Sequence, residues 1–553
     1  MAIVVCNRLA EQSAESNPVR ERHGAAVRWM TQGLLLILLA IHLPAFVRMP
    51  LDCDVTHYDL CARTVLMYDG VLYRDALDTN LPGMPWLHMM LRSVAGWSPE
   101  VLRLADLAVV GLLIFALVRW LPEGCSATDR WLTVWILAAF YLSTSEWCHV
   151  QRDVWMLLPC MLALRCRRRQ ILALCQSASF DRRNLIRPVV EGLLWGTAFW
   201  IKPFVAVPAL FCWSIGVWKV LRVQPMRRRR IVGDAFLLIF GGMLAGAAGS
   251  AWLIATGAWP TFWEIMWVWN RQYVTHDFSD NEGPMLALGL FVRFFPWMLL
   301  PALAIPLACR SLYDSGNPTE GQNSKNVEAV DRALLAALYL GWIVQVVALQ
   351  HLFDYVYVPI LFLTLILLCR RYALEPPGTG RTVILACLLL GVVLRLPAPT
   401  LQRLAAWPLC WQRTESAELL DRLSVFQRMN WTDLERVEEF LLERKIRDGE
   451  VVCWAPRANP LYAALNVRPP SRYLLMHLNL RVFARQREQI WTEIQRCPVR
   501  FVVCDIYFDK WKADGANSKS FPQDRLVFQA GRYVVYAIDA ACLRDWVETN
   551  LEL

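Results

Sequence analysis

The chain has 553 residues, of which 56% are hydrophobic, and its formal net charge is +9. Soluble domains are usually about 45–50% apolar, and the excess here is concentrated in long runs, such as Gly33–Pro44, Val101–Val118, Ala235–Thr256 and Ala333–Leu349. A helix needs roughly 20 mostly apolar residues to cross a bilayer. The composition therefore excludes an ordinary soluble protein and indicates an integral membrane protein that crosses the lipid bilayer many times.

The positive charge lies between the hydrophobic runs, as arginine clusters that include Arg227–Arg230. This placement is typical of cytoplasmic loops and not of a nucleic-acid interface. The 17 cysteines are scattered without a C-x-x-C pair, which favours small core residues over metal fingers. A disulfide among Cys453, Cys497 and Cys504 stays open.

In chain order, residues 1–29 are polar and lack the pattern of a cleavable signal peptide. They predict a cytoplasmic N-terminal segment, and the first span then serves as the insertion signal. Eleven spans place most arginines inside, with the N-terminus inside and the C-terminus outside; ten or twelve stay open. The junction at Lys202–Pro203 is either one broken helix or two helices that meet at a turn. The predicted spans are 30–48, 100–120, 131–146, 154–166, 188–201, 203–222, 231–256, 286–309, 332–350, 355–371 and 381–398.

Two connections on the outer face are long, at 49–99 and 257–285. The first contains a helix-like stretch, Tyr58–Tyr68, followed by a turn at Asp69–Gly70. The second is rich in tryptophan, with Trp259, Trp263, Trp267 and Trp269. Such a segment is either an interfacial aromatic belt or a wall of a site that packs against sugar or lipid.

Beyond residue 398 no apolar run is long enough to span, so 399–553 predicts an extracytoplasmic α/β domain. Helical periodicity covers Leu419–Arg428, Asp433–Lys445 (with Thr432 as its cap) and 480–496. Short apolar runs predict strands and a βαβ unit, at Val451–Trp454, Phe501–Cys504 and Tyr533–Tyr536. No glycine-rich phosphate-binding motif follows these strands, so we predict no nucleotide site.

Charged residues at the outer ends of the spans are the candidates for chemistry. Asp52 and Asp54 follow the first span, and either is a general base if it is partly desolvated, or else a solvated loop acid. Asp153 begins a later span beside Arg152, as an interfacial pair or a functional acid.

Two further charged or titratable side chains belong to the same face. Lys202 lies at the end of an apolar stretch, where it either snorkels or binds an anion such as phosphate. His351 occupies a short outer turn, and an interfacial position is the simpler interpretation. A base, a cation and apolar walls around one cavity suit a reaction on a lipid-borne anionic substrate.

The order of these features resembles the GT-C superfamily of polyprenyl-phosphate-sugar glycosyltransferases, which includes protein O-mannosyltransferases and bacterial aminoarabinose transferases. Asp54-Val55-Thr56-His57-Tyr58 is similar to the family's first-loop Asp-Glu-x-x-Tyr motif, with Val55 in place of the second acid. The resemblance covers about 30–398. It continues in segments similar to later family motifs, namely Gly70–Asp75, Asp78–Gly83, Arg152-Asp153, Lys202 after Gly192–Gly196, and Gln350–Pro359.

The resemblance implies a GT-C-like transmembrane domain over 30–398 and a mechanism. A sugar on a polyprenyl phosphate would be transferred with inversion to an extracytoplasmic glycan, lipid or protein acceptor. Asp54 would be the general base, with Asp153 as a second catalytic acid and Asp52 as the rival to Asp54. The substrate-binding residues would be Asp52, Tyr58, Arg74, Asn80, Arg152, Lys202 and His351. No cofactor is assigned, and because Val55 replaces the second acid, the need for a divalent cation is open.

The resemblance also implies a multi-pass protein of the plasma (inner) membrane, with no nucleic-acid partner. Two other classes stay open, a multi-spanning transporter and a non-catalytic envelope assembly protein. A transporter predicts mid-membrane acids and an internal repeat, whereas the sequence has no repeat and its charges gather at one face. An assembly protein would leave Asp54 dispensable.

Overall fold

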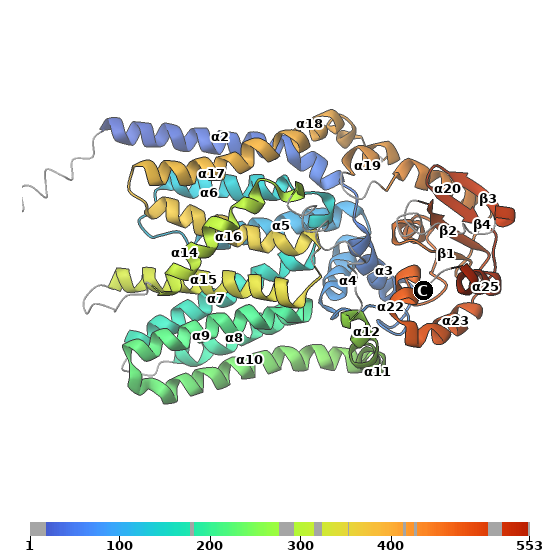
Figure 1. Cartoon of the computed structure of the whole chain (residues 1–553), viewed down its shortest axis with the longest axis horizontal. Coiled ribbons are helices and arrows are strands. Elements are labelled where there is room, and N and C mark those ends of the chain that lie inside the picture. The colour runs from blue at the N-terminus through green and yellow to red at the C-terminus, as the bar shows by residue number, and fades with distance from the viewer. Residues whose placement is uncertain are drawn as a thin grey trace, which may run out of the picture.

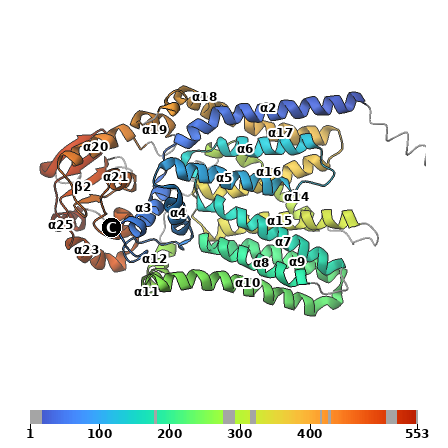
Figure 2. The ribbon, with the colours of Figure 1, turned by 180° about the vertical axis from the view of Figure 1, so that it is seen from behind.

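Long helices that lie side by side build the larger part of the computed structural model, and a small sheet domain covers one end of this bundle (Figure 1; from behind in Figure 2). The structure describes residues 18–176, 182–275, 292–313, 323–351, 353–412, 416–424, 429–506 and 523–550. Within them, eleven helices overlap the eleven predicted spans: α2 (Pro18–Arg48), α5 (Pro99–Val118), α6 (Ala127–Leu142), α7 (Arg152–Gln176), α8 (Arg182–Ile201), α9 (Ala206–Val223), α10 (Arg228–Ala255), α14 (Pro301–Tyr313), α15 (Asn323–Leu349), α16 (Val358–Leu374) and α17 (Thr379–Arg395).

Seven stretches of the described chain are long and apolar enough to cross a membrane by length and composition, so the protein is a multi-pass membrane protein. They are Arg28–Arg48, Pro99–Val118, Pro203–Val223, Arg228–Ala255, Val327–Leu349, Asp354–Leu374 and Thr379–Ala406. The count of eleven crossings stays a prediction. Parts of the predictions 1–29, 257–285 and 286–309 lie outside the described residues.

The junction at Lys202 separates two helices. Helix α8 ends at Ile201, Lys202 is extended (φ −157°, ψ 117°), and a 3₁₀ turn, Pro203–Val205, leads into α9. The missing N–H and fixed φ of Pro203 suit the first turn of a new helix and not the continuation of an old one. Lys202 is thereby placed on a non-helical link at the end of the bundle.

Helices α8 and α10 pack closely because small residues face each other. A Cβ added to Gly192 would lie 2.0 Å from the carbonyl oxygen of Leu238, and one added to Gly241 would lie 2.1 Å from that of Val189. Glycine therefore allows the two backbones to touch, as is common between helices in membranes. This contact holds the middle of α8 against α10.

A layer of short helices lies between the bundle and the sheet domain (Figure 1). It contains α3 (Cys53–Met67) and α4 (Gly83–Ala95) from the first outer connection, then α11 (Trp259–Glu264) and α12 (Asn270–Thr275) from the second. Some tryptophans of the second connection fit an interfacial belt, and another packs inside the protein. Trp263 and Trp267 are about half exposed, whereas Trp269 is buried and packs on Tyr473 of the sheet domain, with ring centroids 6.1 Å apart.

The C-terminal domain holds a four-stranded sheet with the order β1-β2-β4-β3. β1 (Val451–Cys453) pairs in parallel with β2 (Phe501–Asp505), β4 (Tyr533–Tyr536) is antiparallel to β2, and β3 (Leu526–Ala530) forms the edge. The three predicted strands are present, and β3 is an addition. The helices of the domain and its approach are α18 (Pro397–Ala406), α19 (Ala417–Leu423), α20 (Trp431–Glu443), α21 (Pro460–Ala464), α22 (Met476–Val482), α23 (Arg487–Gln495) and α25 (Ala540–Asn550).

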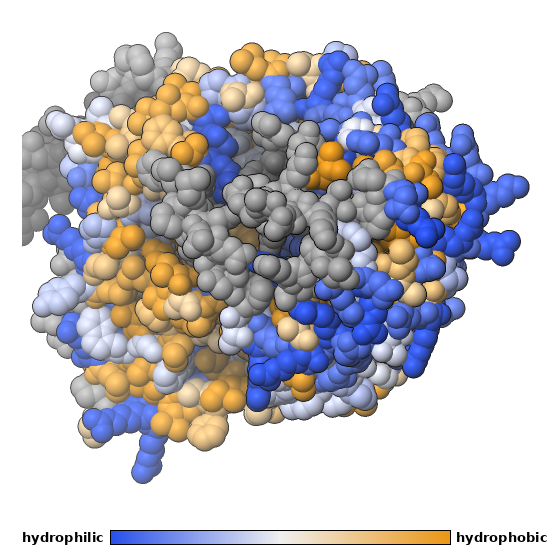
Figure 3. All heavy atoms as spheres, turned by 45° about the vertical axis from the view of Figure 1, so that its right-hand side comes forward, coloured by the Kyte–Doolittle hydropathy of each residue, from blue (hydrophilic) through white to orange (hydrophobic). Residues whose placement is uncertain are grey.

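The prediction that Thr432 caps the second tail helix is wrong. Thr432 lies inside α20, and the carboxylate of Asp421 accepts the backbone N–H groups of Trp431 and Thr432 instead. Among the described cysteines, Cys453, Cys497 and Cys504 form no disulfide. Hydrophobic surface gathers over the bundle and hydrophilic surface over the sheet domain (Figure 3), as a membrane-spanning part and a water-exposed part require.

Candidate active site

Asp52 and Asp54 flank the start of α3 but have different environments. Asp52 is the N-cap: its Oδ1 accepts the backbone N–H groups of Asp54 (2.6 Å) and Val55 (3.0 Å), and its Oδ2 accepts the Gln151 amide (2.7 Å). It is 1% exposed. Both of its oxygens are therefore occupied in starting α3 and in tying that helix to the residue that precedes α7.

Asp54 lies in the first turn of α3 and faces the end of the bundle. Burial raises the pKa of its carboxyl group, while Arg152, His57 and Trp147 lower it in part. The carboxylate is thus partly desolvated and has a cation beside it, two conditions that favour a base working near neutral pH.

Arg152 is the cation that acts most strongly on the Asp54 carboxylate. It starts α7 and donates a hydrogen bond to the side-chain oxygen of Asn80 in the first outer connection. Its buried Nε has no hydrogen-bond partner among the described residues. Three phenol groups lie within electrostatic reach of its guanidinium, those of Tyr58, Tyr273 and Tyr355. The Nε–H of Arg152 can therefore donate a hydrogen bond to an anion, in surroundings that contain three tyrosine side chains.

Lys202 forms a second cationic centre. Its Nζ donates to both oxygens of Asp153, at 2.8 and 2.9 Å, and also to the side-chain oxygen of Gln350. Lys202 is 3% exposed and Asp153 is fully buried. Burial lowers the pKa of Lys202 to about 8, although Asp153 raises it. The ring of Tyr355 lies 5.8 Å from Nζ, which connects this centre to the tyrosines around Arg152.

The remaining predicted residues lie at different distances from this cluster. Tyr58 is buried beside Arg152, and the ring of His351 packs edge-on against Tyr273, with centroids 5.6 Å apart. Arg74 is more than half exposed, pairs with its neighbour Asp75 (2.7 Å), and lines a separate cleft of about 370 Å³. The structure therefore gathers Asp54, Tyr58, Asn80, Arg152, Asp153 and Lys202, borders them with His351, and leaves Arg74 apart.

Sequence reasoning missed three groups of this site. Trp147 and Tyr355 face the charges directly. His57, Cys61 and Asp78 form a buried cluster whose ligand atoms all lie within 4.8 Å of one another, a set able to hold a metal ion. The spacing of His57 and Cys61, four residues apart on one helix, was a signal that could have revealed part of this cluster.

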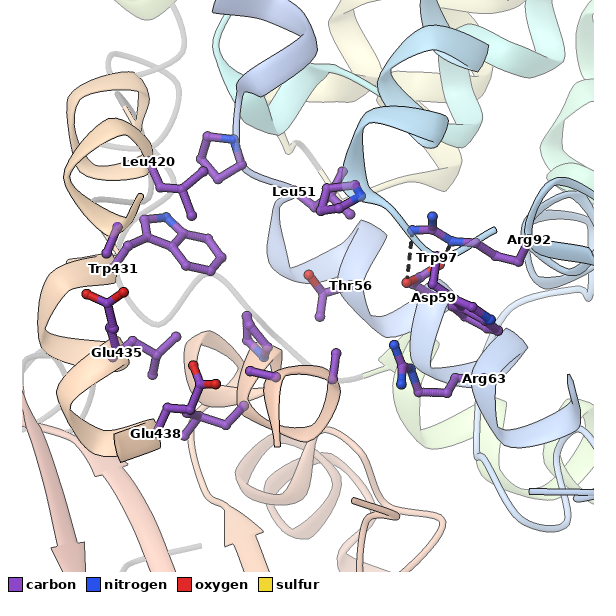
Figure 4. Close-up of a pocket in the computed structure, with 18 residues that line it drawn as sticks. Leu51, Thr56, Asp59, Arg63, Arg92, Trp97, Leu420, Trp431, Glu435 and Glu438 are labelled. Atoms are coloured by element: carbon purple, nitrogen blue, oxygen red, sulfur yellow. Dashed lines mark hydrogen bonds and ion pairs between the residues drawn. The ribbon is translucent and has the colours of Figure 1, made fainter. Parts of the chain in front are cut away.

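The opposite face of α3 lines a cavity of about 290 Å³ against the C-terminal domain (Figure 4). Thr56, Asp59 and Arg63 contribute from α3, and Trp431 and Glu438 stand across from them on α20. Arg92 of α4 fixes Asp59 through contacts of 2.7 and 3.1 Å. Helix α3 thus contacts the catalytic candidates on one side and the sheet domain on the other.

A helical bundle of this topology, with short helices at its end and a C-terminal α/β domain, is the GT-C fold. The crystal structure of ArnT from Cupriavidus metallidurans bound to undecaprenyl phosphate superposes with a TM-score of 0.51 at 13% identity, over 92% of this chain and 97% of that one. The resemblance read from the sequence is thereby confirmed at the level of the fold.

A second comparison concerns the archaeal oligosaccharyltransferase AglB from Archaeoglobus fulgidus, solved with an inhibitory peptide and a dolichol-phosphate. It gives a TM-score of 0.45 at 11% identity, over 88% of this chain and 70% of that one. No family model and no curated protein matches the chain.

Proposed function

We propose that the protein is a glycosyltransferase that moves a sugar from a polyprenyl-phosphate donor to an acceptor on the outer face of the plasma (inner) membrane. One observation carries this proposal. A partly desolvated carboxylate, Asp54, shares the end of the bundle with a half-buried cation, Arg152, and a buried one, Lys202. The fold supports it, since ArnT with this fold was solved with undecaprenyl phosphate bound.

In this proposal Asp54 removes the proton from an acceptor hydroxyl or amine as that atom attacks the anomeric carbon. The new bond forms opposite the phosphate, the bond from the anomeric carbon to the phosphate oxygen breaks, and its electron pair leaves with the phosphate. The anomeric centre is therefore inverted. Arg152 and Lys202 stabilise the negative charge on the leaving group, and phosphate leaves without a strong general acid.

The environments of the three acids support different roles. Asp52 spends both oxygens on the cap and Gln151, and Asp153 spends both on Lys202. Asp54 is the acid whose carboxylate is left to face the cations. We therefore assign the base to Asp54 and give Asp153 the task of holding Lys202 in position. The exposed Arg74 takes no part in the chemical step.

The decisive experiment compares Asp54→Asn with Asp69→Asn. Mass spectrometry of envelope glycans and glycolipids from a deletion strain identifies the product that is lost, and each variant is then tested for its return. Asp69 is an exposed acid of the same connection with a left-handed φ of 49°, which asparagine adopts readily, so its variant is a matched control.

We expect Asp69→Asn to restore the product fully and Asp54→Asn to restore none of it, at equal membrane levels of protein. Full restoration by Asp54→Asn would rule out the assigned base and would favour a transporter or an assembly protein.

A further inference from the structure

Three potential metal ligands meet directly behind the proposed base. His57 and Cys61 lie one turn apart on α3, on the same face of the helix as Asp54. Asp78 comes from the connection after α3. The Nε2 of His57 lies 3.8 Å from the Sγ of Cys61 and 3.8 Å from the Oδ1 of Asp78. All three residues are buried, with 6%, 0% and 2% of their surface exposed.

These separations are close to those of a tetrahedral site. Zinc binds imidazole nitrogen at about 2.0–2.1 Å, thiolate at about 2.3 Å and carboxylate oxygen at about 2.0–2.2 Å, so tetrahedral angles put nitrogen and sulfur about 3.5 Å apart and nitrogen and oxygen about 3.4 Å apart. Side-chain movements of a few tenths of an ångström close the difference. Three protein ligands leave the fourth position open.

The carboxylate of Asp78 has one oxygen that is still available to bind an ion. Its Oδ1 accepts the backbone N–H (2.9 Å) and the side-chain amide (2.8 Å) of Asn80, whereas its buried Oδ2 has no hydrogen-bond partner among the described residues. A buried carboxylate oxygen without a partner is costly. A cation between Asp78, His57 and Cys61 that reaches Oδ2 as well as Oδ1 removes that cost.

We propose that His57, Cys61 and Asp78 form a binding site for a transition-metal ion of the zinc type. Thiolate and imidazole select such ions over magnesium and calcium, which prefer oxygen ligands. The site does not need the second acid that Val55 replaces, because its ligands are two and six residues after Val55 on α3 and on the next connection. This inference goes beyond the proposed function and does not depend on it.

The position of the site indicates that a bound metal ion would hold Arg152 in place. Asn80 links Asp78 to Arg152, since its amide donates to Asp78 and its oxygen accepts from Arg152. A metal ion that joins Asp78 to α3 therefore fixes Arg152 relative to the turn that carries Asp54. The ligands are positioning residues for the cluster of charges and contact no reacting atom.

A simpler arrangement is an ion pair between His57 and Asp78 with Cys61 as a packed thiol. Cobalt(II) distinguishes the two, because a thiolate bound to tetrahedral cobalt gives a near-ultraviolet charge-transfer band together with visible ligand-field bands. The full-length protein in detergent is treated with chelator, desalted and titrated with cobalt chloride. We expect about one cobalt per chain with both sets of bands.

Matched variants locate the ligands. Cys61→Ser should lose the charge-transfer band, and His57→Gln should lower the cobalt affinity at least tenfold. Cys53→Ser, a change to another cysteine of α3, should keep the wild-type spectrum. A charge-transfer band that persists in Cys61→Ser, or cobalt uptake by the wild type no greater than by a His57→Gln/Cys61→Ser variant, would overturn the proposal.

A second measurement covers variants that fold poorly. Because a ligand that binds the folded state raises the melting temperature, zinc chloride should raise the Tm of the wild type and of Cys53→Ser but not that of Cys61→Ser. Equal shifts in Cys53→Ser and Cys61→Ser would also contradict the site.

Discussion

The Lys202–Asp153 pair permits a test that separates stability from catalysis. Both side chains are almost completely buried and their charged atoms are 2.8 Å apart. Replacing Lys202 by Met leaves the Asp153 carboxylate buried without its cation, and breaking a buried pair in this way costs about 3–5 kcal/mol. Replacing both residues by apolar ones of similar volume, Lys202→Met with Asp153→Leu, is often neutral or stabilising by comparison.

The assay follows the Tm of purified protein in detergent and the restoration of the missing glycan in cells. We expect a lower Tm and no product for Lys202→Met. The double variant should regain most of the wild-type Tm but make far less product than the wild type, because the leaving phosphate has lost a cation. Loss of one such electrostatic contact typically lowers the rate about 10²–10³-fold. A double variant that is both stable and active would refute the phosphate-binding role and leave Lys202 a purely structural residue.

Three further outcomes are expected. A pH–rate profile should fall as pH rises through about 8, where Lys202 loses its proton, and should also fall at acidic pH as Asp54 is protonated, at a pKa that burial holds above the usual carboxyl value. Gly192→Ala should lower the Tm because its Cβ would meet backbone at 2.0 Å, whereas Gly233→Ala, with nothing within 4 Å, should not. A topology reporter fused near residue 400 should be active outside the membrane and one near residue 228 inside; the reverse would place the acids in the cytoplasm.

The hydrophobic runs predicted the bundle well because a span must be apolar over most of its length. The strands β1, β2 and β4 were visible for a similar reason, since each is buried along its whole length. Strand β3 alternates between partly exposed and exposed positions up to its buried last residue, Ala530, and lies at the edge of the sheet. Its apolar run, Leu526–Phe528, has three residues and stops at Gln529, whereas each predicted strand has a run of four, so the pattern that found its neighbours missed it.

The pairings within the site could not be read from the sequence. Asp153 lies in α7 and Lys202 follows α8, 49 residues further along the chain, and their contact depends on how α7 and α8 pack. The distinction between Asp52 and Asp54 depends on where α3 begins. The predicted helix started at Tyr58, and only the earlier start at Cys53 makes Asp52 a cap and puts Asp54 in the first turn.

Helix α3 lies between the candidate active site and the cavity that faces α20, and this position constrains how the domains of such a protein can be exchanged. A chimera that exchanges the C-terminal domain alone would place foreign side chains against Thr56, Asp59 and Arg63. Any rotation of α3 that accommodates them would also turn Asp54 away from Arg152. A functional exchange of acceptor specificity should therefore transfer the first outer connection together with the C-terminal domain, as one inherited unit.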